Sequence, residues 1–306
     1  MESSDTSISI CIVSYQTRQY LSRCLKSIYA HPPRRSFEVI IADNGSTDGT
    51  GEWLQGEFPQ VKVIQNTQNL GYTAAMNQAL RLATGEYLVQ LNPDTEVEQG
   101  AFDTLADFLD VHPEVGICGP KVLNPDGTLQ RSCRRGESTP LAVMAHFSGL
   151  DRLFPQNPRF AQYWLSYYPE DEIHPVAGVS GSCMMIRRQV VDQIGYLDER
   201  FFAYQEDADY CFRARQAGWK VMYVPTAKIL HYGGLGGSHV QPYRSIIEWH
   251  RSYWNYYRKN LAHAYPGWFN VLYTLMMAAK LGLSLALQAL NLGRFSKRRL
   301  KGRPFS

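Results

Sequence analysis

The chain has 306 residues, of which 44% are hydrophobic and 19% are charged, and its formal net charge is +3. These values predict a packed core and exclude a disordered chain, and the length allows one large domain with an appendage. The small basic excess gathers in residues 294–303 instead of along a groove. That distribution favours an anionic surface such as lipid headgroups, and no nucleic-acid partner is expected.

The cysteines and the N-terminus bear on the cellular compartment. Six cysteines are scattered without a Cys-x-x-Cys pair, which predicts reduced core thiols instead of a disulfide framework or a zinc site. The first seven residues are polar and acidic, and the apolar run after them is only about six residues long. A signal peptide needs a basic start and a longer apolar stretch, so a cytoplasmic protein is expected.

In chain order, the first half alternates short apolar runs with amphipathic stretches. Strands are predicted at residues 8–13, 37–43, 61–65, 86–91 and 115–119. Helices are predicted at residues 18–29, 47–58, 72–83 and 98–111. Apolar strands separated by helices indicate βαβ units, so the predicted fold class is α/β, with a doubly wound, mostly parallel sheet sandwiched by helices.

Polar residues follow three of these strands, at positions 14–15, 43–46 and 92–94. Parallel sheets bind ligands at the carboxyl ends of their strands, so these three segments are expected to line one crevice. Turn formation and helix capping account for any one of them equally well. The three together favour a binding site.

Beyond residue 120 the pattern changes. The sequence predicts a hairpin at 122–129, an irregular aromatic-rich segment at 134–175, an apolar stretch at 176–186, a helix at 206–218, and strands at 219–224 and 229–231. A connector as long as 134–175 is typical of a binding loop or lid. The glycine-rich segment 233–238 lacks the strand-to-helix context of a dinucleotide fingerprint, so a flexible loop is expected there.

Four side chains are candidates for chemistry. Asp94 follows a strand, where a carboxylate suits a hard cation bound to a diphosphate, although an Asx turn is an equal structural alternative. Glu206 and Asp207 begin a helix, where carboxylates also complement the helix dipole. Aromatic residues just before them would desolvate a carboxylate, as a general base requires. His231 ends a strand, and a lone histidine is more often structural than a ligand.

Five motifs, spread over about three quarters of the chain, carry a family resemblance. They read ISICIVSYQT…IIADNGSTD (8–48), NLGYTAAMN (69–77), LNPDT (91–95), VSGSCMMIR (179–187) and GYLDERFF…ED…H (195–231). In this order and spacing the chain resembles the family-2 glycosyltransferases, and its overall pattern is similar to bacterial rhamnosyltransferase-like members.

The resemblance implies a GT-A fold and an inverting transfer of sugar from a nucleotide-diphosphate donor. It implies Asp207 as the general base, with Glu206 orienting Asp207 or the acceptor. It implies Asp94 and His231 as ligands of a Mg²⁺ or Mn²⁺ ion at the diphosphate. The nucleotide-sugar pocket would comprise Ser14, Tyr15, Asp43, Asn69, Gly71, Asn77, Asn92 and Arg244.

Two departures from the family pattern matter. The paired-aspartate metal motif is here Asn92-Pro93-Asp94, so one carboxylate is available and cation affinity should be weak until the nucleotide sugar binds. Processive members carry Gln-x-x-Arg-Trp, whereas this chain has Ser245 in place of the tryptophan. Addition of a single sugar is therefore expected, with Arg244 facing a phosphate of the donor or of a lipid acceptor.

The predicted organisation is a catalytic domain at 1–240, divided into a nucleotide-binding half (1–120) and an acceptor and catalytic half (121–240), with a helical membrane-associating appendage at 241–306. Residues 268–293 are almost entirely apolar and, as a helix, would measure about 39 Å, enough to span a bilayer. Lys280 at the centre would cost roughly 2.5–3.5 kcal/mol.

A single span would also carry residues 294–303 across the membrane, against the positive-inside tendency. An interfacial or re-entrant hairpin at the cytoplasmic face of the membrane is therefore predicted, because it keeps both ends cytoplasmic and places the basic cluster on anionic lipid. A helix packed on the domain or in a dimer interface is the alternative.

The sequence thus predicts a non-processive glycosyltransferase that acts on a saccharide or lipid-linked acceptor in cell-surface polysaccharide synthesis. Family analogy makes thymidine diphosphate rhamnose a candidate donor. A non-catalytic sugar- or lipid-binding subunit is the alternative. A nicotinamide oxidoreductase would need glycine after the first strand, where residues 14–17 have none, and a nucleotidyltransferase would need a basic N-terminal phosphate loop, which is not found.

Overall fold

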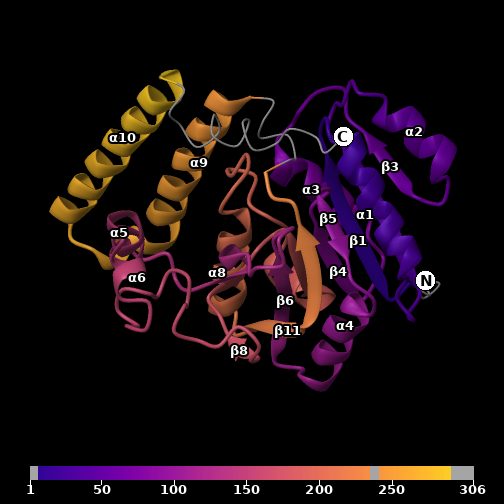
Figure 1. Ribbon diagram of the computed structural model, residues 1–306, viewed down its shortest axis with the longest axis horizontal. Coiled ribbons are helices and arrows are strands. Elements are labelled where there is room, and N and C mark those ends of the chain that lie inside the picture. Colours follow the sequence, from indigo (N-terminus) through magenta and orange to yellow (C-terminus); the bar gives the residue numbers. More distant parts are fainter. Residues whose placement is uncertain (1–5, 235–240, 291–306) are drawn as a thin grey trace.

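The computed structural model describes residues 6–234 and 241–290. Its first half is a parallel sheet built from the predicted apolar runs, with nearly every residue of the central strands buried. These strands are β1 (Ile8–Ser14), β2 (Phe37–Asp43), β3 (Lys62–Gln65) and β4 (Tyr87–Leu91). Their helices are α1 (Arg18–Ala30), α2 (Thr50–Glu57), α3 (Tyr72–Leu82) and α4 (Ala101–Val111). The prediction of a helix-flanked, mostly parallel sheet is confirmed (Figure 1).

The second half of the chain extends the same sheet. It contributes β5 (Thr95–Val97), β6 (Val115–Leu123), β8 (His174–Pro175), β10 (Cys183–Arg187) and β11 (Lys220–His231). The strand order is β3-β2-β1-β4-β10-β6-β11-β5, with β8 paired to β11. Strand β10 runs antiparallel between β4 and β6. Because it runs the other way, the start of β10 lies beside the end of β4, which brings residues from both halves to one edge.

Several local predictions need correction. The strands predicted at 219–224 and 229–231 are one strand, β11, with a register irregularity between Val224 and Lys228. The stretch at 176–186 divides into β9 (Gly178–Val179) and β10. The predicted hairpin at 122–129 is the end of β6 followed by a turn, with one bridge between Leu123 and Leu129.

The segment 134–175 was predicted to be irregular, but it contains α5 (Pro140–Ser148) and α6 (Leu150–Leu153). Helix α5 begins with Pro140 after Thr139, whose hydroxyl accepts from Ala142 N–H at 3.3 Å, a regular N-cap. The segment also begins with the short strand β7 (Arg134–Arg135), which pairs with β9. Buried Arg134 donates to the carbonyls of Tyr168 and Pro169, and these bonds hold the far end of the segment in place.

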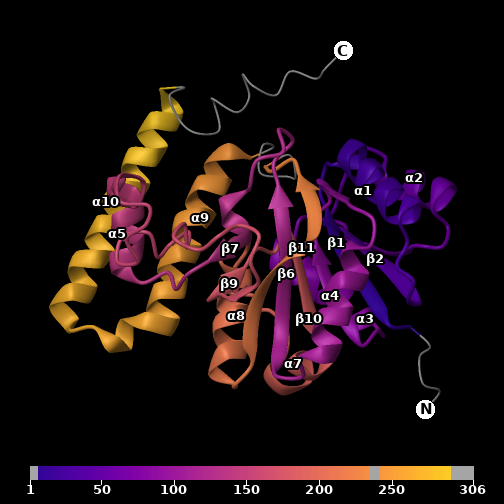
Figure 2. The same ribbon diagram turned by 60° about the horizontal axis from the view of Figure 1, so that its bottom comes forward.

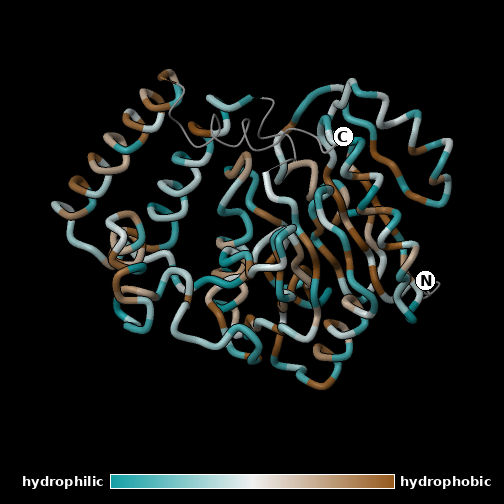
Figure 3. Tube along the Cα trace, in the orientation of Figure 1, coloured by the Kyte–Doolittle hydropathy of each residue, from teal (hydrophilic) through white to brown (hydrophobic). Residues whose placement is uncertain are grey.

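The second half also contains the helices α7 (Arg188–Ile194), α8 (Glu206–Gln216), α9 (Pro242–Tyr256) and α10 (Gly267–Ala289). Helices α9 and α10 lie side by side in both views (Figures 1 and 2). A second apolar cluster joins them to α5 through Val143, Tyr253, Tyr273 and Met277. In Figure 3 the hydrophobic colour fills the central strands and recurs along α10, whereas α9 is mostly hydrophilic.

Two predicted features lie outside the described residues: most of the glycine-rich segment 233–238, and the basic cluster at 294–303. All six cysteines are unbridged and buried, as predicted.

Candidate active site

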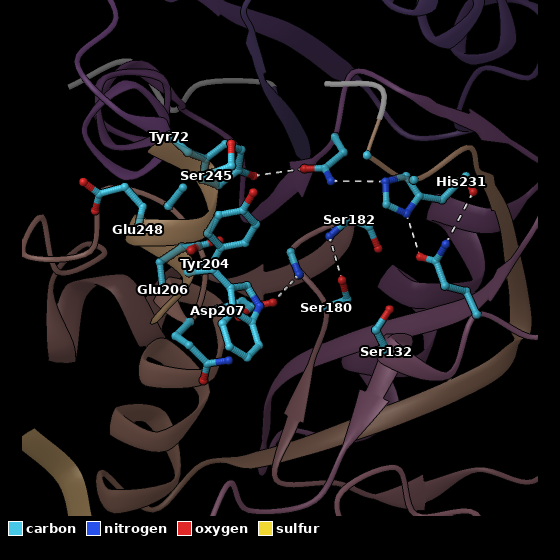
Figure 4. Close-up of a pocket in the computed structure, with 18 of the residues that line it drawn as sticks. Tyr72, Ser132, Ser180, Ser182, Tyr204, Glu206, Asp207, His231, Ser245 and Glu248 are labelled. Atoms are coloured by element: carbon cyan, nitrogen blue, oxygen red, sulfur yellow. Dashed lines mark hydrogen bonds between the residues drawn. The ribbon is translucent and has the colours of Figure 1, made fainter. Parts of the chain in front are cut away.

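A cavity of about 1090 Å³ lies at the carboxyl ends of the parallel strands. The ends of β1 and β4 and the turn before β10 form one side, and α9, α5 and the start of α8 form the other. Figure 4 shows Glu206 and Asp207 on one side, His231 on the other, and Ser180 and Ser182 between them. The sheet therefore brings both groups of candidate residues from the sequence to one site.

Strand register assembles the Asp94 end of this cavity. In the antiparallel pairing of β11 with β5, His231 lies opposite Thr95. Tyr232 N–H donates to the carbonyl of Asp94 at 3.0 Å, and Asn92 N–H donates to the carbonyl of Ser182 at 3.0 Å. These bonds tie the backbone of segment 92–94 to the residue before β10 and to the residue after β11, so the backbone that carries these side chains is fixed before any ligand arrives.

The side chains of Asp94 and His231 meet at this end. His231 Nε2 lies 3.1 Å from Asp94 Oδ1 and 3.3 Å from Asn92 Nδ2. On the other side of the ring, His231 Nδ1 lies 2.7 Å from Gln130 Oε1. An amide oxygen can only accept, so Nδ1 carries the proton there and the ring orientation is fixed. Asp94 and His231 are both buried, with 3% and 8% of their surface exposed.

This geometry bears on whether a cation fits. Nε2 of the ring faces the carboxylate oxygen of Asp94, and either a proton on Nε2 or a cation bound to both atoms satisfies this contact. Within residues 6–234 and 241–290, no group of three or more His, Cys, Asp or Glu side chains could hold a metal by itself. Asp94 and His231 thus fit a divalent cation whose remaining ligands come from a bound diphosphate.

At the other end, Glu206 and Asp207 begin α8. The two residues before them, Tyr204 and Gln205, have φ angles of +68° and +63°. Residues other than glycine in this left-handed region cost of order 1–3 kcal/mol each and cluster at functional sites. This turn directs the first helical residues towards the cavity.

Asp207 is held by a buried network. Its Oδ2 accepts from Gly181 N–H at 2.9 Å and pairs with Arg135 Nη2 at 2.5 Å. Its Oδ1 accepts from Ala208 N–H at 2.7 Å. The ion-paired side chains of Arg135 and Asp207 are only 10% and 11% exposed, so each charge depends on the other. Of the two carboxylate oxygens, Oδ1 has fewer partners.

Glu206 lies next to Asp207 in a different environment. Its Oε2 is buried and makes no hydrogen bond within the described residues. Burial raises the pKa of the Glu206 carboxyl, and the charge of Asp207 raises it further. The two adjacent carboxyl groups are therefore unequal: Asp207 is paired with a cation, and Glu206 favours its protonated form.

The structure places eight of the twelve candidate site residues on the cavity wall. These are Tyr15, Asn69, Asn92, Asp94, Glu206, Asp207, His231 and Arg244. The guanidinium of Arg244 lies 4.1 Å from the ring centre of Phe202, so this residue of α9 is held over an aromatic face at the cavity. The other four residues, Ser14, Asp43, Gly71 and Asn77, are not part of the wall, and the local hydrogen bonds explain why.

Asp43 is fully buried, and its carboxylate accepts from Ser46 N–H at 3.3 Å and from Gln65 Nε2 at 2.7 Å. It therefore shapes the turn that carries Asn44, which does line the cavity. Ser14 Oγ forms a hydrogen bond with Thr17 Oγ1 at 3.0 Å.

Asn77 and Gly71 also have structural explanations. The amide of Asn77 bonds to both backbone groups of Leu197 and so ties α3 to the segment before α8. Gly71 has a φ of +94°, and a Cβ at this position would lie 2.8 Å from the carbonyl oxygen of Phe202. A side chain there would push away the aromatic segment that precedes Glu206.

Sequence reasoning missed two residues of this site, Arg135 and Gln130. Arg135 reaches Asp207 because the two-residue strand β7 pairs with β9, with Arg135 opposite Gly178. A strand of that length leaves no periodic pattern to detect. Gln130 belongs to the turn after β6, and only the fold brings it to His231, 101 positions away in the sequence.

Comparisons with known proteins identify the family of this chain. The model of the family described as Glycosyl transferase family 2 matches residues 9–195, more than half of the chain. The protein belongs to this family and is a glycosyltransferase.

Two relatives show the range of named activities. A Mycobacterium tuberculosis protein named N-acetylglucosaminyl-diphospho-decaprenol L-rhamnosyltransferase is 30% identical over 272 residues, covering 81% of this chain and 86% of the relative. The Haloferax volcanii low-salt glycan biosynthesis hexosyltransferase Agl10 is 27% identical over 215 residues, covering 68% of this chain and 62% of the relative.

Solved structures share the GT-A fold at low identity. The mannosyltransferase PcManGT from Pyrobaculum calidifontis, in complex with GDP-Man and Mn²⁺, has a TM-score of 0.57 at 17% identity, covering 96% of this chain and 83% of that one. TarS 1–349 of S. aureus, in complex with UDP-GlcNAc, has a TM-score of 0.54 at 16% identity, covering 84% and 68%.

Proposed function

We propose that the protein transfers one sugar, with inversion, from a nucleotide-diphosphate sugar to a hydroxyl of a saccharide or lipid-linked acceptor. The observation that carries this proposal is that a paired carboxylate, Asp207, and the Asp94–His231 pair line the same cavity. Sugar transfer needs a base for the acceptor and positive charge at the departing diphosphate. The non-catalytic alternative requires neither.

The donor occupies the side of the cavity formed by the first half of the chain. Tyr15, Asn69 and Asn92 contact the nucleotide sugar, and Asp43 supports that wall from within. Asp94 and His231 would hold Mg²⁺ or Mn²⁺ together with the diphosphate, and Gln130 keeps the ring of His231 in the ligand orientation. When bound, the cation would supply positive charge that stabilises the leaving diphosphate.

Asp207 acts as the general base. The acceptor O–H gives its proton to Asp207 Oδ1, the oxygen with fewer partners, while the acceptor oxygen forms a bond to the anomeric carbon. The bond between that carbon and the diphosphate oxygen breaks on the opposite side, which inverts the configuration. Arg135 pairs with Oδ2 of Asp207 and so holds the carboxylate in place before the acceptor arrives. Glu206 is the neutral neighbour that donates a hydrogen bond to the acceptor.

Two features of α9 support single-sugar addition and a phosphate-bearing substrate. Ser245 stands where processive members carry a stacking tryptophan, and it lines the cavity. Arg244, also on the wall, presents a fixed cation to a phosphate of the donor or of a lipid acceptor.

The relative from Mycobacterium tuberculosis is named for L-rhamnose and a diphospho-decaprenol acceptor, and it aligns with most of this chain. On this ground we propose thymidine diphosphate rhamnose as donor and a lipid-linked acceptor in cell-surface polysaccharide synthesis. The reaction takes place in the cytoplasm, at the inner face of a membrane.

The test is release of nucleoside diphosphate from a panel of nucleotide sugars, with Mg²⁺ or Mn²⁺ and a membrane extract as the acceptor source. One donor should give release that depends on both the cation and the extract. The Asp94→Asn variant should need more cation and donor, whereas Asp126→Asn, in an exposed turn, should behave as the parent protein. Donor binding without release from any member of the panel would favour the non-catalytic alternative.

A further inference from the structure

Helix α10 packs on the protein through one face only. Tyr273 and Met277 are each 3% exposed and belong to the apolar cluster with α5 and α9. The opposite face is also apolar but is exposed to solvent. We define this outer face by Trp268, Val271, Leu272, Leu275, Leu283, Leu287 and Leu290, which are 37–70% exposed. Neighbouring α5 adds exposed Leu141, Met144 and Phe147.

Large apolar side chains that are exposed together along one face of a helix mark an interaction site. Among the described residues, α10 is the helix long and apolar enough to cross a bilayer. Length and composition therefore leave two arrangements with respect to a membrane, spanning it or lying on it. The position of Lys280 decides between them.

Lys280 is at the middle of α10 but faces the protein. Its Nζ lies 4.0 Å from the ring centres of both Phe147 and Trp249, and 3.3 Å from His250 Nε2. His250 Nδ1 is bonded to the carbonyl of Ile246 at 2.8 Å, and burial lowers the pKa of this histidine, so Nε2 is free of a proton and accepts from the ammonium. The outer face thus carries no charge, while the single cation is satisfied on the inner side.

A helix that spans the bilayer would have to leave α9 and expose Lys280 to lipid, at a cost of roughly 2.5–3.5 kcal/mol. A helix that lies flat keeps every inner contact and buries only the outer face. The packing therefore favours the flat arrangement.

The charge distribution of the sequence identifies the kind of surface. Ten Lys or Arg residues and no Asp or Glu follow Glu248, so the chain before that point carries a net negative charge although the whole is +3. Six of those ten cations fall within residues 294–303, directly after α10. An apolar helix followed by a polybasic segment matches a bilayer that contains anionic lipids better than it matches a second copy of this chain, because two such tails would repel one another.

The inner side of α10 packs against residues that line the active-site cavity. Phe147 and Trp249 line the cavity and at the same time hold Lys280 of α10. One layer of side chains from α5 and α9 therefore separates the cavity from α10.

From these observations we infer that α10 lies flat on an anionic lipid bilayer through its outer face, and that this seating brings the α5–α9 side of the cavity to the membrane surface. An acceptor anchored in lipid then reaches Asp207 without leaving the bilayer. This inference deepens the proposed function, because it rests on a lipid-linked acceptor for its purpose.

The first test is flotation of the full chain with phosphatidylcholine vesicles, with and without phosphatidylglycerol. The parent protein should float with the anionic vesicles. Leu272→Glu/Leu275→Glu, two changes at positions 57% and 62% exposed, should bind at least about a hundredfold more weakly, since burial of each leucine is lost and charge is added. The control Leu82→Glu/Val111→Glu changes exposed residues of α3 and α4 and should float as the parent does.

Equal flotation of the Leu272→Glu/Leu275→Glu variant and the control would overturn the inference, and so would a parent protein that stays unbound. If the parent protein were a dimer that binds no vesicles, and the same variant were a monomer, the outer face would instead be an interface with a second copy of the chain. Thermal unfolding of each variant checks that it is folded.

Cation-dependent release of nucleoside diphosphate from the donor, measured in detergent, should persist in the Leu272→Glu/Leu275→Glu variant. A parent protein that gives release but does not float overturns only this inference, and a parent protein that floats but gives no release overturns only the proposed function.

A second test separates lying from spanning. All six native cysteines are buried, so a fluorophore can be attached at single cysteines introduced as Trp268→Cys, Leu275→Cys and Leu290→Cys. Quenching by lipids labelled at different depths should place all three positions at the same shallow depth. A middle position deeper than both ends would mean that the helix spans the bilayer, and would overturn the flat arrangement.

Discussion

At the Asp94 end of the cavity, the register of β11 against β5 places His231, and backbone bonds hold the segment 92–94 between two strands. At the Asp207 end, strand pairing is limited to the two-residue strand β7, which carries Arg135. A strained turn, a glycine N–H and one buried arginine hold the carboxylate instead. Strand pairing thus positions the Asp94 end, whereas the Asp207 carboxylate is held mainly by a buried ion pair with Arg135 and by the N–H of Gly181. Substitutions should therefore affect the two ends differently.

The largest effect is expected for Asp207→Asn. Loss of a positioned general base should lower kcat by about a hundred- to ten-thousand-fold. Binding of the nucleotide sugar at the other end should change little, which calorimetry with the donor can measure. Turnover comparable to that of the parent protein would remove Asp207 from the role of base.

Arg135→Leu tests whether the Asp207 end is held by charge. Removing one partner of a buried ion pair leaves the other charge uncompensated, so unfolding in denaturant should show a loss of roughly 3–5 kcal/mol. The double variant Arg135→Leu/Asp207→Asn should recover most of that stability but none of the activity. If the single and double variants were equally unstable, the pair would contribute through packing and not through charge.

Gln130→Leu tests the Asp94 end by removing the hydrogen-bond partner of His231 Nδ1. Loss of the hydrogen bond that orients His231 should raise the concentration of Mn²⁺ or Mg²⁺ needed for half-maximal activity by about 10–100-fold. Stability should change far less than in Arg135→Leu, because strand register is untouched. A cation requirement like that of the parent would show that the orientation of His231 does not depend on Gln130.

The last prediction concerns pH and Glu206. In the unfolded chain this carboxyl titrates near the ordinary glutamate pKa of about 4.3, whereas in the folded protein burial raises its pKa. Its contribution to stability is therefore greatest below the unfolded pKa and is lost as pH rises through the folded pKa, at about 1.4 kcal/mol per unit of separation. Denaturation of Glu206→Gln across this range should show a gain over the parent as pH rises, whereas exposed Glu98→Gln should run parallel to the parent.

The sequence predicted the first half of the fold well because each strand there is a continuous apolar run and each helix an amphipathic one. It failed at 134–175, where the aromatic and proline content of the segment masked the cap and period of α5. Placing the site residues was harder. Asp43 and Asn77 follow or lie within the predicted elements, yet their side chains turn inward to Gln65 and Leu197. A pattern gives the position of a residue along an element, but not which neighbour takes its hydrogen bonds.

Some properties of this protein are set by local sequence: the alternation of strands and helices, the polar residues at the strand ends, and the apolar length of α10. These depend on periodicity and composition, which act over a few residues. The tertiary structure alone decided that Arg135 pairs with Asp207, that Gln130 orients His231, and that Lys280 turns towards Phe147 and Trp249. Each of these contacts joins segments far apart in the chain, so it exists only once the packing of the sheet and the C-terminal helices has fixed the distances between them.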